Sequence, residues 1–397
     1  MTIRPPVSDW STDWDYLDER WQQDPYPIWD ELRAKCPVAH TERYLGVYLP
    51  TRYEDVKAVA YDTEHFSSRR VIVRAERPEL SAPSPAPPIT SDPPAHKPAK
   101  QMLLPFFTPD AIRKLEPATR ATCNELIDRF VGEQRIDAAQ SYSRHIPVRV
   151  ITHMLGIPES DNDQFIVWLH QLLELGVTDQ AQVRLASQEM REYFERHIER
   201  IGKEGGDNLI SELLAIRQDG EPLSMPYLLG VLQLLLLAGI DTTWSAIGAC
   251  LWHIAKFPED RRRLVAEPGL MPLAIEEFLR AYAPVTMARE VVKETVIGGC
   301  PIKPGNMLLL SFPAANRDPG VFADADKVIL DRRENRHLAF GIGIHRCVGS
   351  NLARMEMTVA IEEFLKRIPD FALDPTGEVS WSQGPVRGPR TLRLLLR

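Results

Sequence analysis

The sequence predicts a mainly α-helical protein with a minor β region. Apolar residues recur at helical spacing over 109–217, and 226–257 has the composition of one long apolar helix. Short β-type runs lie beside Pro and Gly turns at 291–310, and the C-terminal 391–397 also has the pattern of a strand. Because 44% of the 397 residues are hydrophobic, and no repeat or linker is visible, we expect a single domain over 1–397.

The N-terminal part alternates irregular segments with short regular elements. Residues 1–27, rich in Trp, Asp and Pro, predict an irregular arm, and 27–35 predicts a short helix. A strand at 47–50 is expected before a helix at 53–60. Seven prolines between 78 and 94 exclude a regular helix or a central strand there, which leaves a surface loop.

The helical part that follows has interruptions at defined positions. Within 109–217 we expect breaks at Pro147, at 156–158 and at the glycine pair 205–206. Two further helices are predicted at 259–265 and 272–283.

Composition excludes several classes of protein. A net charge of −8 without a basic block argues against nucleic-acid binding. The five cysteines are scattered and form no CxxC pair. Their placement is typical of a protein in the reducing cytoplasm, and it argues against a zinc or iron–sulfur site. The N-terminus lacks an apolar core, and the most apolar run, 228–240, is shorter than the roughly 20 residues that span a bilayer. We therefore expect a cytoplasmic protein that binds no membrane.

A glycine-rich loop over 337–354 holds one cysteine, Cys347, shortly before a helix-forming run. A helix N-terminus stabilises an anionic sulfur, and His345 and Arg346 would lower the pKa of the thiol or bind carboxylates. This pattern fits an axial sulfur ligand for haem iron. The alternative is a buried structural cysteine in a turn.

The long apolar helix contains an unusual polar turn at 238–243, Ala-Gly-Ile-Asp-Thr-Thr. Gly239 weakens the helix by about 1 kcal/mol relative to Ala, and a buried Asp241 needs a partner or water. The turn predicts a groove that admits a small molecule. A simple kink is the alternative.

These two motifs resemble those of the cytochrome P-450 family. Phe340-x-x-Gly343-x-x-x-Cys347-x-Gly349 is similar to its haem-binding signature, and 238–243 is similar to its oxygen-binding motif. The resemblance implies a triangular helical prism with small antiparallel sheets. It also implies haem b (iron protoporphyrin IX) with Cys347 as thiolate and metal ligand.

The resemblance assigns further roles. It implies that Asp241 and Thr242 deliver protons during dioxygen chemistry. The residues implied to bind the haem are His96, Lys100, Arg289, Phe340, His345, Cys347 and Gly349. Lys100 departs from the arginine that the family has there, and a lysine lacks the bidentate fork of arginine.

The resemblance also implies a scaffold and a substrate pocket. Glu277 and Arg280 match a structural Glu-x-x-Arg motif, whose partner we place at Arg332, with Arg333 as the rival. The proline-rich loop would shape substrate access. Expected pocket residues are Leu234, Ala238, Val285, Met287 and Val386.

The function implied is a monooxygenase that inserts one oxygen atom of O2 into a small to medium apolar organic substrate, aromatic ones included. Electrons would come from a ferredoxin or flavodoxin-type donor with its reductase. The strings 87–100 and 238–244 also resemble haem domains of self-sufficient fusions, so an excised domain with a fused reductase is an alternative. We expect a monomer.

Three other functions remain open from the sequence. They are a peroxide-driven member of the same fold, a thiolate haem sensor without turnover, and a haem-free all-α binding protein. The pair Asp241–Thr242 argues against the first.

Overall fold

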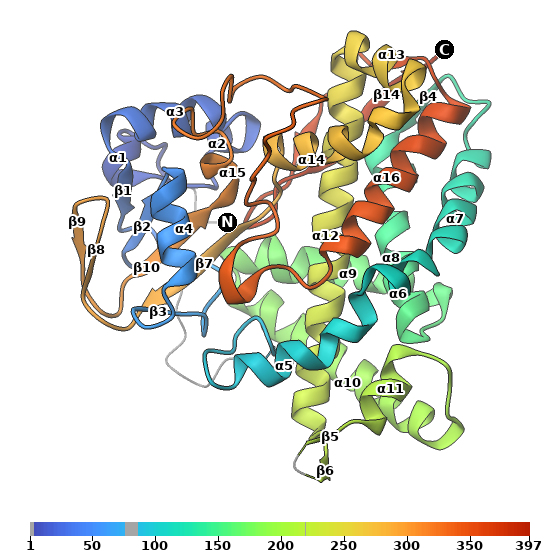
Figure 1. Ribbon diagram of the computed structural model, residues 1–397, viewed down its shortest axis with the longest axis horizontal. Helices are drawn as coiled ribbons and strands as arrows, with labels where there is room; N and C mark the ends of the chain where they lie inside the picture. The colour runs from blue at the N-terminus through green and yellow to red at the C-terminus, as the bar shows by residue number, and fades with distance from the viewer. Residues whose placement is uncertain (1–3, 76–85, 219) are drawn as a thin grey trace.

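The computed structural model describes residues 4–75, 86–218 and 220–397. Helices fill one side of the molecule and a smaller sheet the other, which confirms the mainly α prediction (Figure 1). The long helix α12 (Met225–Lys256) runs through the middle of the helical part. By length and composition α12 could cross a membrane, but 72% of its most apolar 18-residue window is buried inside the protein. It is the central core helix.

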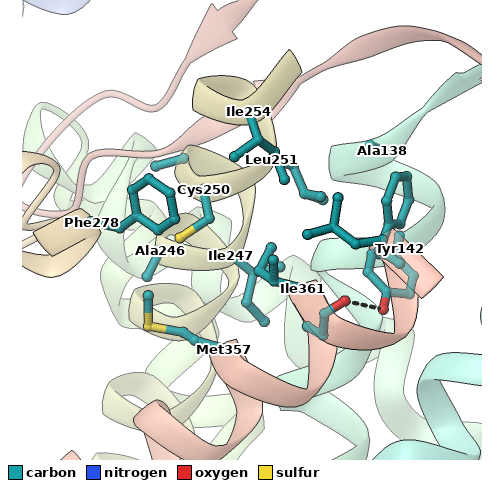
Figure 2. Packing of buried hydrophobic residues seen from close by; sticks show 14 of the residues in the cluster. Ala138, Tyr142, Ala246, Ile247, Cys250, Leu251, Ile254, Phe278, Met357 and Ile361 are labelled. Atoms are coloured by element: carbon teal, nitrogen blue, oxygen red, sulfur yellow. Dashed lines mark hydrogen bonds between the residues drawn. The ribbon is translucent and has the colours of Figure 1, made fainter. Parts of the chain in front are cut away.

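The helices α8 (His145–Leu155), α10 (Gln180–Glu204) and α16 (Ser350–Arg367) pack against α12. In the upper half of this core, Ile247 and Leu251 of α12 belong to one buried cluster with Ile361 of α16 (Figure 2). The α12–α16 contact fixes the start of α16, and with it the cysteine loop, against the long helix.

The predicted break at Pro147 is wrong. Pro147 lies in the first turn of α8. Backbone N–H groups in a first turn make no hydrogen bond within the helix, so a proline, which lacks an N–H, is tolerated there. The irregular backbone comes earlier, as a π-helical turn at Ala139–Ser143. The short strand β4 (Arg135–Asp137), which precedes that turn, was not expected and pairs with the C-terminal strand β14 (Arg393–Leu396).

The main sheet has five strands in the order β1-β2-β10-β7-β3. Its centre is β10 (Met307–Ser311), parallel to β2 (Val47–Pro50) and antiparallel to β7 (Thr286–Val291). All five residues of β10 are buried, as expected for a strand covered on both faces. The expected arm at 1–27 contains two short helices, and its tryptophans pack against this sheet.

The other predicted helices begin and end within two residues of the expected positions. Of the expected loop at 78–94, residues 78–85 lie outside the described residues, and 86–94 form turns. The remaining α-helices are α1 (Trp10–Asp13), α2 (Glu19–Gln23), α3 (Tyr26–Lys35), α4 (Tyr53–Tyr61), α5 (His96–Leu103), α6 (Pro109–Arg113), α7 (Glu116–Asp128), α9 (Asn162–Leu173), α11 (Leu209–Ala215), α13 (Pro258–Ala266), α14 (Met271–Ala281) and α15 (Phe312–Ala315). The remaining strands are β1 (Val38–Thr41), β3 (Phe66–Ser67), β5 (Arg217–Gln218), β6 (Glu221–Pro222), β8 (Thr295–Ile297), β9 (Cys300–Ile302), β11 (Phe371–Leu373), β12 (Ser380–Trp381) and β13 (Pro389–Thr391).

Candidate active site

A large, mainly apolar cavity lies between α12, α5, β7 and the loop that leads into α16. About 1460 Å³ of space free of protein atoms lies in the cavity and its opening to solvent. Cys347 lines it from the loop, and Ala238, Gly239 and Thr242 line it from α12. The cavity therefore joins the two motifs that the sequence analysis singled out, although about 100 residues separate them.

The cysteine loop is shaped by two glycines with left-handed backbone. Gly341 has φ 63° and Gly343 has φ 73°. A Cβ at Gly343 would lie 2.9 Å from the carbonyl oxygen of Ala60, so a larger residue would push the loop off α4. The curled loop lets the Cys347 N–H donate to the Phe340 carbonyl at 2.8 Å. These contacts hold the cysteine three residues before α16 begins.

Burial raises the pKa of the Cys347 thiol, and the nearby Arg346 and Lys100 offset this only in part. Arg346 therefore acts in the expected direction, but the effect of burial on the pKa outweighs it. The exposed surface of Cys347 faces the cavity, since the residue is one of its lining residues. A bound metal ion deprotonates a coordinating thiol outright, so such a site needs its metal to hold the thiolate.

Five basic side chains line the same cavity, and none of them forms an ion pair with a carboxylate among the described residues: His96, Lys100, Arg289, His345 and Arg346. Burial lowers the pKa of Arg289 to about 10 and that of His345 to about 3, and it also lowers the pKa of His96. The His96 and His345 rings are 4.3 Å apart, and the buried His96 Nε2 has no hydrogen-bond partner among the described residues. This donor set fits the two carboxylates of a haem, which would supply the missing partners.

Two residues that the sequence analysis missed position these histidines. Ser68 Oγ lies 2.9 Å from His345 Nε2, and the Ser68 N–H donates to Asp92 Oδ1 at 2.8 Å. The Asp92 carbonyl also accepts the backbone N–H of His96 at 3.0 Å, which begins α5. No sequence spacing links Ser68 to these residues, so only the fold reveals the arrangement.

Lys100 makes contacts that differ from the expected ones. Its Nζ donates to the carbonyls of Ile344 at 2.5 Å and Arg346 at 2.8 Å. Both acceptors are backbone groups of the cysteine loop. The long, flexible side chain of Lys100 lets its ammonium extend to these carbonyls, whereas the ring of His96, one turn earlier, faces the cavity.

Asp241 and Thr242 are adjacent in α12 but face different surroundings. Thr242 lines the cavity, and its Oγ1 donates to the Ala238 carbonyl at 2.6 Å. Asp241 is not among the lining residues. Its Oδ1 accepts from Arg390 Nη2 at 2.7 Å, whereas the buried Oδ2 has no partner in the described part of the chain. Burial raises the pKa of Asp241 to about 6, against the opposing charge of Arg390.

Arg390 in β13 connects Asp241 to a second carboxylate. Its Nε donates to Glu174 Oε1 at 2.7 Å, and His170 Nδ1 lies 3.7 Å from the same oxygen. The chain runs very close to α12 at Gly388, the residue before β13. A Cβ at this glycine would therefore lie 2.3 Å from Ser245 Cβ. The network therefore extends from a buried acid to His170, whose side chain is 55% exposed.

A second buried acid, Glu356, lies where α16 meets α12. The residue is 1% exposed, and neither carboxylate oxygen has a hydrogen-bond partner among the described residues. Burial raises the pKa of Glu356 well above its usual value, and the nearby Thr243 hydroxyl opposes this only weakly. Burial therefore favours the neutral form of the Glu356 carboxyl over the carboxylate. Its place in an ordinary helical run gave no sequence signal.

The Glu-x-x-Arg pair is fully buried beneath the loop. Arg280 Nη2 donates to Glu277 Oε1 at 2.8 Å, and both side chains are 0% exposed. Of the two arginines considered as partners, Arg332 donates to Glu277 Oε2 at 3.0 Å.

Four of the five expected pocket residues line the cavity: Leu234, Ala238, Val285 and Met287. Val386 is not among the described lining residues. It is 7% exposed and forms a backbone bridge with Val285, so it supports the wall from behind. Pro88 and Ile89, from the described end of the proline-rich loop, complete the apolar wall.

The chain is similar to known proteins over nearly its whole length. A family model described as Cytochrome P450 matches residues 148–380. Mycinamicin IV hydroxylase/epoxidase of Micromonospora griseorubida is 34% identical over 374 residues, which cover 91% of this chain and 93% of that protein. Cytochrome P450 monooxygenase PikC of Streptomyces venezuelae is 32% identical, with 100% of this chain and 96% of that protein covered.

A solved structure shares the same architecture. The structure of CYP109E1 from Bacillus megaterium in complex with testosterone superimposes with a TM-score of 0.87 at 30% identity. The match covers 94% of this chain and 97% of that chain.

Proposed function

Because this chain belongs to the cytochrome P450 family and is a monooxygenase that binds haem b through a cysteine thiolate, we propose that Cys347 is the ligand and that the cavity takes a small to medium apolar substrate. The observation that carries this proposal is the cavity that brings Cys347, Thr242 and a group of basic side chains together. We further propose that residues 1–397 act as one haem-thiolate domain.

The protein's own residues orient the cofactor. Bound haem supplies the activation of dioxygen and the oxygen-atom transfer. Cys347 binds the iron from the loop, with Phe340 and Gly349 around the sulfur. His96, Arg289 and His345 would bind the propionates, Arg289 as a buried cation and the two histidines as hydrogen-bond donors.

Thr242 and Asp241 move the protons that dioxygen cleavage consumes. The Thr242 hydroxyl faces the cavity and holds a proton donor in place. With a pKa near 6, Asp241 exchanges protons readily at neutral pH, and its unpartnered Oδ2 is the atom that carries the proton. Arg390, Glu174 and His170 connect this acid toward the surface.

The apolar wall sets the substrate class. Leu234, Val285 and Met287 offer no charged group, so an ion would lose hydration without compensation. Neutral apolar molecules, aromatic ones included, fit such a wall. An organic substrate is supported by the relative named as a mycinamicin IV hydroxylase/epoxidase and by the similar structure that holds testosterone.

Electrons come from a ferredoxin or flavodoxin-type donor with its reductase, or from a fused reductase if the domain is excised. We place the enzyme in the cytoplasm as a monomer, without nucleic acid or membrane partners. On the surface near the cysteine loop, Arg346 is exposed. Arg354 is paired with Glu276 at 2.5 Å and is therefore less available to an acidic donor.

The reduced, carbon monoxide-bound spectrum tests the ligand. The wild type should show the Soret shift typical of thiolate ligation, Cys347→Ser should lose it, and Cys300→Ser, a half-buried cysteine outside the cavity, should keep it. Product formation with labelled O2, a donor and a reductase separates an oxygenase from a gas sensor. A wild-type spectrum without the thiolate band would contradict the proposal.

A further inference from the structure

Lys100 contacts the cysteine loop at two points. It stands one turn after His96 on α5, and its Nζ donates to the carbonyls of Ile344 and Arg346 at 2.5 and 2.8 Å. The contact with Ile344 is half-buried and that with Arg346 is exposed, and a lysine ammonium carries three donors. Two of the three are therefore used by the loop.

The second acceptor lies next to the sulfur ligand. The Arg346 carbonyl belongs to the peptide bond whose N–H is that of Cys347, and this N–H donates to Phe340. Lys100 thus binds one side of the peptide while Phe340 binds the other. The peptide plane that precedes Cys347 is fixed from both ends.

We infer that Lys100 is a positioning residue for Cys347, holding the loop and placing a positive charge beside the sulfur instead of pairing with a propionate. The inference rests on the proposed function, because it takes Cys347 as the iron ligand. The propionates are then left to His96, Arg289 and His345, which line the cavity and form no ion pair with a carboxylate among the described residues.

The charge has a measurable consequence. One-electron reduction adds a negative charge to the haem–thiolate unit, and a cation nearby favours the reduced state. Replacing Lys100 by Met keeps the stem and removes the charge. The reduction equilibrium constant should fall about tenfold, which corresponds to ~59 mV for a one-electron couple.

The same change should loosen the loop. Without donors for Ile344 and Arg346, the Cys347 sulfur should leave the iron more readily. We expect Lys100→Met to lose the thiolate-type carbon monoxide band several times faster in mild urea. Lys100→Arg keeps the charge and both donors, so it should retain the wild-type value of both quantities to within about twofold.

The experiment measures the reduction potential and the rate of band loss in holoenzyme. Lys97→Met, on the same helix but exposed, is the matched control and should change neither. If Lys100→Met does not fold, Lys100→Gln removes the charge while keeping a donor, and the potential alone should fall. If Lys100→Met had the same reduction potential as Lys97→Met, the inference would be overturned. Faster loss of the carbon monoxide band at an unchanged potential would overturn it as well. A wild type without the thiolate band would instead refute the proposed function.

Discussion

Arg390 donates to Asp241 Oδ1 at 2.7 Å, which joins the acid of α12 to a strand 149 residues further along the chain. The pair is buried, with side-chain exposures of 14% and 3%. Because the same guanidinium binds Glu174, just after α9, three segments meet at one cation. The charge state of Asp241 is therefore set by residues far from it in sequence.

The first prediction concerns the titration of Asp241. Its folded pKa, about 6, lies above the unfolded value, so the folded state binds more protons between these values, and this contribution to stability is lost as pH rises through 6. Between pH 4.5 and 7 the wild type should lose roughly 2 kcal/mol of unfolding free energy that Asp241→Asn does not lose, so the difference between the two proteins should shift by that amount in favour of the variant. Urea unfolding at several pH values measures this. A difference that does not vary with pH would contradict the assignment.

The second prediction concerns the Thr242 hydroxyl. Thr242→Val keeps the shape but cannot hold a proton donor, so product formed per O2 consumed should fall roughly tenfold or more. Thr242→Ser, which keeps the hydroxyl, should stay near the wild-type ratio. Oxygen uptake measured beside product gives the ratio. Equal coupling in the Val and Ser variants would remove Thr242 from the proton path.

The third prediction is that Glu356 is neutral. Its raised pKa means that stability falls as pH increases above the unfolded value near 4.5. Glu356→Gln, neutral and of equal size, should be at least as stable as wild type at pH 7, with an advantage that grows with pH. Glu362→Gln on the same helix, which removes an ion pair with Arg120, is the control and should show no such growth. Strong destabilisation by Glu356→Gln at pH 7 would mean an ionised carboxylate.

The fourth prediction concerns the buried pair beneath the loop. Glu277→Ala leaves Arg280, 0% exposed, without a counter-charge and should cost roughly 3–5 kcal/mol of unfolding free energy. Glu259→Gln breaks the exposed pair with Arg262 and should cost less than about 1 kcal/mol. Denaturant unfolding of both variants gives the comparison. Similar costs would show that Glu277 is not needed to balance Arg280.

The sequence allowed the helical class, the long core helix and the two motifs to be predicted, because each depends on local spacing. The helix at His96 was expected from a short motif, and the Glu277–Arg332 contact, between residues 55 positions apart, was implied by the family resemblance. In these cases a local pattern and the tertiary contact agree.

The remainder depends on contacts that no spacing encodes. Arg390 could not be linked to Asp241, nor Ser68 to His345, because only the packing of distant segments brings them together. The raised pKa values of Cys347 and Glu356 come from burial, which composition does not reveal at single positions. Pro147 was misjudged because proline breaks a helix interior but is tolerated in a first turn.

The close approach of Gly388 to Ser245 matters for protein engineering. Any side chain at position 388 would collide with α12 and displace the strand that carries Arg390. Mutant libraries restricted to the cavity wall would leave this strand unsampled. Position 390 therefore belongs in any randomisation scheme meant to alter how efficiently the enzyme uses its reducing equivalents, whereas Gly388 should be kept.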